Sequence, residues 1–273
     1  MEDNLQGKIE LLTYRNLSAF SNIFHFTTTR KGGVSHENYE ALNLSPFSGD
    51  CLSDVLTNQR ILTDYLQISH EHLIIPYQIH KDRIKIIPDN FKSYSAQEKN
   101  EFLYGVDALI TNISGFCIGI TTADCTPILL YDSEKKVVAS IHAGWRGTVK
   151  SISEKTVLLM QSQFACCPEN IWAAIGPCIG ETVYEVGDEV FLAFKENGFP
   201  MNEISFFNEQ TKKYHINLTK ANTFSLIKAG VPVNHIESAD VCTFNNAETF
   251  FSARKQGIQS GRFLSAIMLK EES

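Results

Sequence analysis

Apolar residues form short, nearly continuous runs through the middle of the chain, and these runs predict a buried β-sheet. Each run has the length of a strand, and together they cover residues 107–111, 116–122, 126–132, 137–144 and 171–177. The polar stretch 132–135 is typical of a hairpin turn between two of them. Strands with one solvated face alternate apolar and polar residues, so runs without alternation indicate a sheet covered on both faces.

Helical spacing predicts helices around this sheet. They are expected at 54–66, with Ser53 as N-cap, and at 148–164, 187–197 and 218–229, the last ending at Gly230. Further strands are expected within 23–35, 72–80, 83–88, 235–243, 250–254 and 262–269. The strands 72–80 and 83–88 should be joined tightly at 81–82, and 90–100 should be an exposed loop.

The order of these elements predicts the fold class. Strands come in runs rather than in strict β-α-β alternation, which favours an α+β fold over a doubly wound parallel sheet. We expect one layered domain over residues 1–273, with a mixed β-sheet core flanked by helices.

Composition and charge narrow the class of protein. With 43% hydrophobic residues, 18 Phe among them, the 273-residue chain can bury a large core. A net charge of −7 without a basic stripe argues against nucleic acid as a partner. The N-terminus lacks a signal-peptide pattern and no apolar run could span a bilayer, so we expect a cytoplasmic protein without a membrane partner. An odd number of cysteines, seven, fits that compartment.

One cysteine and two histidines at predicted strand ends suggest a metal site. Cys125 and His142 are seventeen residues apart, which suits the ends of two neighbouring strands joined by a hairpin. His80 ends another predicted strand. Two imidazoles and a thiolate would leave a fourth tetrahedral position open, as in catalytic zinc sites.

Two other interpretations use the same side chains. In the first, Cys125 and His142 are structural residues without a chemical role, since a lone cysteine is commonly buried as a small hydrophobe. Alternatively, Cys125 is a nucleophile and His142 its base, with Asp124 orienting the imidazole. An extended strand would, however, point Asp124 away from Cys125. The spacing alone leaves these alternatives open.

Two cations beside glycines are candidates for binding an anionic substrate. Arg146 lies between Gly144 and Gly147 near a predicted helix start, where a ligand can approach closely and an arginine can grip phosphate with two hydrogen bonds. The alternative is a surface turn capped by Arg146. Arg30, in TTRKGGVS, raises the same question more weakly. The neighbouring Trp145 is expected in the core or in a pocket wall.

Six segments in a fixed order resemble one known family. They are TTADCTPILLYD, SIHAGWRGT, AAIGPCIG, YEVGDEV, CTFNNAETFFSAR and SGRF. They are similar to the YfiH/YlmD family, once described as multicopper polyphenol oxidoreductases or bacterial laccases, and the resemblance spans residues 28–269. It implies a YfiH-like fold, which is grouped with cysteine hydrolases. It also implies the activity of a purine nucleoside phosphorylase that deaminates adenosine and cleaves methylthioadenosine.

The resemblance also implies site residues. The metal ligands of the family are the His of a Q-x-H segment, the Cys of A-D-C and the His of H-A-G-W-R-G, which correspond to His80, Cys125 and His142. One segment differs: where the family shows F-F-S-Y-R-R, this chain has FFSARKQ, with Ala253 and Lys255 in place of an aromatic residue and a cation. Specificity would change if those side chains touch substrate.

We therefore expect a zinc-dependent purine nucleoside enzyme. It would cleave adenosine, inosine and methylthioadenosine with phosphate to the base and ribose 1-phosphate, and would deaminate adenosine, as a monomer or homodimer. The expected catalytic residues are Cys125, His142, His80 and Asp124, and the expected substrate-binding residues are Arg146 and Arg30.

Other activities remain open. Copper could occupy the same ligands, because Cu²⁺ binds such sites more tightly than Zn²⁺. A four-copper laccase is disfavoured, since the chain has eight His and one H-x-H pair, at 70–72. The first alternative is a Cys–His amidase that edits peptidoglycan precursors. The second is a copper-dependent polyphenol oxidase or a metal-binding protein without catalysis.

Overall fold

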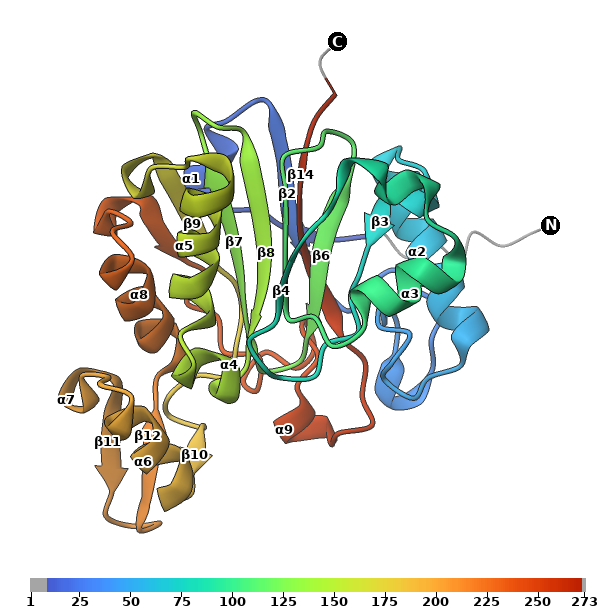
Figure 1. Ribbon diagram of the computed structural model, residues 1–273. Helices are drawn as coiled ribbons and strands as arrows, with labels where there is room; N and C mark the ends of the chain where they lie inside the picture. The colour runs from blue at the N-terminus through green and yellow to red at the C-terminus, as the bar shows by residue number, and fades with distance from the viewer. Residues whose placement is uncertain (1–8, 272–273) are drawn as a thin grey trace.

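Two β-sheets packed face to face form the centre of the protein in the computed structural model, which describes residues 9–271 (Figure 1). One sheet has five strands: β1 (Leu11–Leu12), β2 (Ile23–Thr28), β14 (Phe263–Leu269), β6 (Cys117–Thr122) and β3 (Leu73–Ile74), in that order. The other has six: β13 (Ile236–Ser238), β9 (Ile171–Ile175), β7 (Thr126–Asp132), β8 (Val137–Ala143), β5 (Ala108–Thr111) and β4 (Ile84–Ile86). Both sheets mix parallel and antiparallel pairs.

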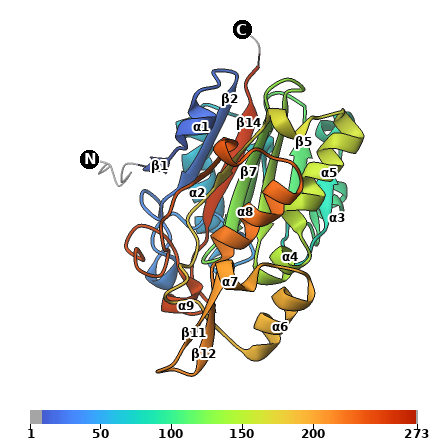
Figure 2. The ribbon, with the colours of Figure 1, turned by 90° about the vertical axis from the view of Figure 1, so that its left-hand side faces the viewer.

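Helices cover the outer faces of the two sheets (Figures 1 and 2). α5 (Ile152–Phe164) and α8 (Leu218–Lys228) bury Met160 and Leu226 against the six-stranded sheet. α2 (Leu52–Leu66) buries Leu62 against the five-stranded sheet. Strand β6 shows why the apolar runs lack alternation: Cys117 faces the α2 layer, whereas Ile118 faces the other sheet. The layered α+β fold is therefore as expected.

A small lobe extends below the six-stranded sheet at the lower left of Figure 1. It consists of a three-stranded sheet, ordered β10 (Glu185–Val186), β12 (Lys213–Ile216) and β11 (Ser205–Asn208), with α6 (Asp188–Glu196) and α7 (Met201–Ile204). Its apolar cluster continues into α8 through Leu218. The remaining α-helices of the described residues are α1 (Arg15–Ser18), α3 (Ala96–Leu103), α4 (Trp145–Val149) and α9 (Ala253–Gln256).

The turn between β7 and β8 confirms the predicted hairpin. Asp132 is fully buried, and its Oδ1 accepts hydrogen bonds from the N–H groups of Glu134 (2.9 Å) and Lys135 (2.7 Å). The predicted helices at 187–197 and 218–229 correspond to α6 and α8. None of the helices in the described part of the chain is long and apolar enough to cross a membrane.

Two helix predictions and one loop prediction need correction. α2 begins at Leu52 with Cys51 as N-cap, so Ser53 lies inside the helix and caps nothing. The predicted helix 148–164 is divided into α4 and α5, because Ser151 has a left-handed backbone with φ 57°. Within 90–100 the expected loop contains the start of α3, whose N-cap Ser95 forms a capping box with Glu98.

Three strand predictions also need correction. The expected strands 72–80 and 83–88 shrink to β3 and β4, which belong to different sheets, so the turn at 81–82 carries the chain from one sheet to the other. Residues 250–254 form no strand: the Ser252 side chain accepts a hydrogen bond from the N–H of Lys255 and begins α9.

Candidate metal centre and cavity

The β7–β8 hairpin brings Cys125 and His142 to one rim of the six-stranded sheet. Cys125 directly precedes β7, and His142 lies near the end of β8 opposite Pro127. Antiparallel pairing fixes this proximity, since the start of one strand faces the end of the other. The seventeen-residue spacing therefore predicted the arrangement correctly.

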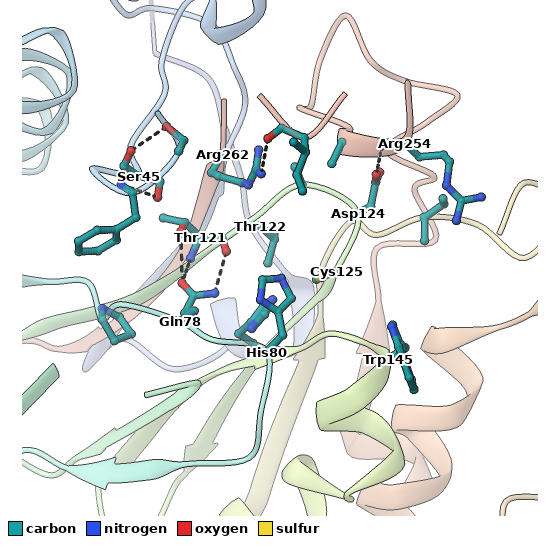
Figure 3. A pocket seen from close by; sticks show the side chains of 18 of the residues that line it. Ser45, Gln78, His80, Thr121, Thr122, Asp124, Cys125, Trp145, Arg254 and Arg262 are labelled. Atoms are coloured by element: carbon teal, nitrogen blue, oxygen red, sulfur yellow. Dashed lines mark hydrogen bonds between the residues drawn. The ribbon is translucent and has the colours of Figure 1, made fainter. Parts of the chain in front are cut away.

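His80 reaches the same place from a loop, not from a strand end as predicted. β3 ends at Ile74, and His80 has a left-handed backbone with φ 59°. The loop is held by Gln78, whose Oε1 accepts from the Thr121 N–H (2.8 Å) and whose Nε2 donates to the Thr121 carbonyl (2.9 Å). This side-chain amide thus takes the place of a neighbouring strand beside the end of β6 (Figure 3).

Asp107, which the sequence did not single out, joins the loop to the hairpin. Its Oδ1 accepts from the N–H of His80 (2.9 Å) and from Nδ1 of His142 (2.8 Å), and its Oδ2 accepts from the N–H of Lys81 (2.8 Å). The carboxylate is fully buried. The sequence did contain an indication of this role. A charged residue begins the apolar run 107–111, and aspartate is rarely buried unless it is paired.

His80, Cys125 and His142 together make a set of metal-ligating atoms. These atoms lie within 4.8 Å of one another, and the two imidazole rings meet edge to face with centroids 4.7 Å apart. The bond from Nδ1 of His142 to Asp107 leaves Nε2 as the ligating atom, a common arrangement at metal-bound histidines. Two imidazoles and a thiolate suit zinc or copper.

The close approach of the three side chains depends on Gly144. A Cβ at this position would lie 3.1 Å from Sγ of Cys125 and 3.4 Å from Cδ2 of His80. Within residues 9–271, His80, Cys125 and His142 are the one group of three such residues that could hold a metal ion. The H-x-H pair does not join it, because His70 bonds to Gln59 and the His72 ring packs on Phe116.

The charges of the set favour a thiolate. Burial alone would raise the pKa of Cys125, but the neighbouring His142 and His80 outweigh burial and bring the pKa to about 6. Burial would lower the pKa of His142, whereas Cys125 and Asp107 raise it to about 9. A thiolate is the form that both binds metal and attacks an electrophile, so these pKa values suit either role.

The three side chains line a cavity of about 640 Å³, which has the size of a small-molecule site. Trp145 forms part of its wall, as expected, and so does Ala253. In Figure 3, His80 and Cys125 lie between Gln78 and Thr121 on the left and Trp145 and Arg254 on the right, with Arg262 above. The other lining residues include Ser45, Phe47, Pro76, Thr122, Asp124, Ile179, Tyr184 and Ile258.

Asp124 lies on the cavity wall but does not contact the imidazole of His142, which Asp107 holds instead. Its backbone is left-handed, with φ 86°, rather than extended as expected. Its Oδ1 accepts from the hydroxyl of Thr243 and its Oδ2 from the N–H of Arg254, both at 2.6 Å. Asp124 therefore ties the β6–β7 turn to the start of α9.

The two arginines that the sequence singled out lie outside the set of residues lining this cavity. The Arg146 guanidinium lies over the Trp145 ring, 4.2 Å from its centroid. Arg30 donates to the carbonyls of Glu40 and Ala247 and lines a separate pocket of about 390 Å³. Arg254 and Arg262 line the cavity instead, and the signal for Arg262 was its place in the SGRF segment.

The fold and the site define a class: a layered α+β protein with a His–Cys–His set at the end of a strand hairpin, open to a cavity. Residues 24–270 match the family model described as multi-copper polyphenol oxidoreductase laccase, and the chain belongs to this family. The resemblance to YfiH proteins is thereby confirmed. The described residues bring together one His–Cys–His set, too few ligands for the several coppers in that description.

Individual proteins match over nearly the whole chain. A purine nucleoside phosphorylase of Bacteroides thetaiotaomicron is 46% identical over 95% of this chain and 96% of its own. An adenosine deaminase named RL5, from an unknown prokaryotic organism, is 42% identical over 90% and 93%. The crystal structure of the hypothetical protein YfiH of Bacillus licheniformis superposes with a TM-score of 0.88 at 27% identity, covering 99% of this chain and 98% of that one.

Proposed function

We propose that the chain is a zinc-dependent purine nucleoside enzyme acting in the cytoplasm. It would cleave adenosine, inosine and methylthioadenosine with phosphate, and would deaminate adenosine to inosine. The observation that carries this proposal is the His80–Cys125–His142 set lining a cavity of about 640 Å³. The names of the relatives, a purine nucleoside phosphorylase and an adenosine deaminase, support the substrate class.

The residues of the chain would act around this set. Zinc, when bound there, would supply a Lewis acid and lower the pKa of a water toward ~7. Asp107 holds His142 in the tautomer that presents Nε2. Trp145 and Tyr184 offer aromatic surfaces on which a purine could stack. The role of Asp124 as a proton acceptor stays a prediction, since both its oxygens already accept hydrogen bonds.

The direct test compares metal-free protein with protein loaded with one equivalent of zinc or of copper. Each is assayed for release of the free base, ribose 1-phosphate and ammonia from adenosine, inosine and methylthioadenosine. We expect turnover with zinc and its loss on chelation. Equal turnover by metal-free Cys125→Ala protein would refute the proposal, and metal binding without any turnover would favour a non-catalytic role.

The lowered pKa of Cys125 favours one second candidate, an amidase in which Cys125 attacks and His142 is the base. Its substrates would be peptidoglycan precursors. An acyl group trapped on Cys125 would support this function. Tight zinc at one equivalent per chain would contradict it, because the thiolate would then be a ligand.

A further inference from the structure

Arg262 is a cation in the cavity whose partners carry no charge. Among the described residues, its Nη1 donates to the carbonyls of Ser260 (2.7 Å) and Gly261 (2.9 Å) and to the Ser260 hydroxyl (3.1 Å), and its Nη2 donates to the carbonyl of Ile258 (3.0 Å). No carboxylate of residues 9–271 pairs with it. Cys125 and Asp124, which line the same cavity, attract its charge from a distance, but neither forms a hydrogen bond or ion pair with it. An anion bound in the cavity would therefore be a direct partner of opposite charge for Arg262.

One edge of the Arg262 guanidinium stays available. The bonds to Ile258, Ser260 and Gly261 occupy both hydrogens of Nη1 and one of Nη2. Of the five N–H donors of an arginine, this leaves the Nε–H and the adjacent Nη2–H, for which the described residues supply no acceptor. These two donors point in parallel, the geometry that binds two oxygens of a phosphate or carboxylate.

The arginine is also held in position before any ligand binds. The Arg262 N–H donates to Oδ1 of Asn43 (2.9 Å), and the Arg262 carbonyl accepts from the N–H of Leu44 (3.1 Å). The carbonyls that receive Nη1 and Nη2 fix the plane of the guanidinium. A donor fixed in advance loses little entropy on binding, so this arrangement favours affinity.

Thr122 adds a second unsatisfied group on the same wall. It pairs with Phe263, the residue after Arg262, and it lines the cavity. The side chain is buried, and its Oγ1 has no hydrogen-bond partner. A buried hydroxyl without a partner costs free energy, which a ligand oxygen would recover after a turn of the side chain about χ1.

We propose that the available edge of Arg262, with Thr122, binds the inorganic phosphate that attacks the nucleoside. This proposal rests on the proposed phosphorolysis. A phosphate oxygen forms a bond to the anomeric carbon of the ribose, and the carbon–nitrogen bond to the purine breaks with its electron pair leaving on the base. The base takes up the proton that the phosphate gives up, so the products are the free purine and ribose 1-phosphate. The cation that binds phosphate is then Arg262 and not Arg146.

The test measures the KM for phosphate during inosine cleavage, beside adenosine deamination, which consumes no phosphate. Because two charge-assisted hydrogen bonds are lost, we expect Arg262→Gln to raise the phosphate KM by about 30- to 100-fold, with a much smaller change in the KM for adenosine. Arg262→Lys keeps the charge but not the paired donors and should raise it about tenfold. Arg60→Gln, at an exposed position on α2, makes the same charge change away from the cavity and should leave the phosphate KM as in the wild type.

An unchanged phosphate KM in Arg262→Gln would overturn the proposal, as would a rise in Arg146→Gln instead. If Arg262→Gln fails to fold, Thr122→Val decides, because the Thr122 hydroxyl forms no hydrogen bond in the fold. We expect it to raise the phosphate KM by about three- to tenfold, and no change would count against the site.

Failure of the proposed function is separable from failure of this site. If wild-type protein turns over no nucleoside, titration calorimetry with inorganic phosphate alone still tests the site. Binding to the wild type that weakens about tenfold in Arg262→Lys supports it, and absence of binding to the wild type overturns it.

Discussion

The three proposed ligands reach one point by two different routes. Cys125 and His142 come from a single hairpin, where strand register brings them together, and His142 is buried. His80 comes from a loop between two sheets and is exposed. The first route needs only local pairing, whereas the second depends on contacts with distant parts of the chain.

Several distant contacts hold the His80 loop. Asp107 binds the N–H groups of His80 and Lys81, and Gln78 binds β6. α4 lies directly against the loop, since a Cβ at Gly147 would be 2.8 Å from the Lys81 carbonyl. We call Cys125 and His142 the hairpin half of the site and His80 its loop half. We expect the geometry of the hairpin half to be robust and that of the loop half to be sensitive to remote changes.

Removing the thiolate from the hairpin half should have the largest effect. Cys125→Ala takes away the one anionic ligand, and loss of zinc removes several kcal/mol of transition-state stabilisation, so we expect turnover to fall by about a thousandfold or more. The measurement is kcat/KM for inosine beside zinc content by mass spectrometry. Cys117→Ala, a buried cysteine outside the cavity, is the control and should retain bound zinc.

Breaking the link between the halves should come next. In Asp107→Asn, an amide NH₂ must face at least one of the donors that the carboxylate now accepts, so zinc affinity should fall by about 10- to 100-fold. The free energy of unfolding should fall by about 1–3 kcal/mol. Asp132→Asn makes the same change at the far end of the hairpin, and an equal loss of zinc affinity there would contradict the role of Asp107.

Moving the loop alone should have a smaller effect. Gly147→Ala forces Lys81 and with it His80 away from α4, while the hairpin register stays intact. We expect zinc affinity to fall about tenfold with little change in Cys125 reactivity. Competition with a coloured chelator measures the affinity, and unchanged binding would mean that the loop position does not limit the site.

The smallest expected effect concerns the protonation state of Cys125 in the hairpin half. The pKa of Cys125 is about 6 in metal-free protein, so its thiolate fraction rises as the pH rises through that value. Alkylation by iodoacetamide, followed by mass spectrometry, should reach half its plateau rate near pH 6. In His142→Ala the midpoint should move to higher pH, and an unmoved midpoint would mean that His142 does not stabilise the thiolate.

The two routes also explain what the sequence could predict. Cys125 and His142 were found because the hairpin turn and both strands lie in one continuous stretch, 121–148. The strand proposed for His80 was wrong, because a side-chain amide of Gln78 replaces a strand neighbour there. Asp107 was missed because its partners come from residues 80–81 and 142, which no local pattern joins.

Two other elements were predicted wrongly from the sequence. One contained a recognisable motif, and the other depends on tertiary packing. Ser95 and Glu98 fit the capping-box spacing, so the start of α3 was predictable from the sequence. The apolar run at 250–254 instead buries Phe250 and Phe251 in a cluster with Phe263, and its chain turns into α9. Such burial without strand pairing depends on the assembled fold.

We expect His80, Cys125 and His142 to hold one zinc ion in the cavity. Anomalous diffraction at the zinc edge, from crystals of zinc-loaded protein soaked with a purine nucleoside, tests it directly. We expect a single strong peak bonded to Sγ of Cys125, Nε2 of His142 and a ring nitrogen of His80, with the nucleoside beside it. A peak elsewhere, or a covalent adduct on Cys125 with no metal, would contradict it.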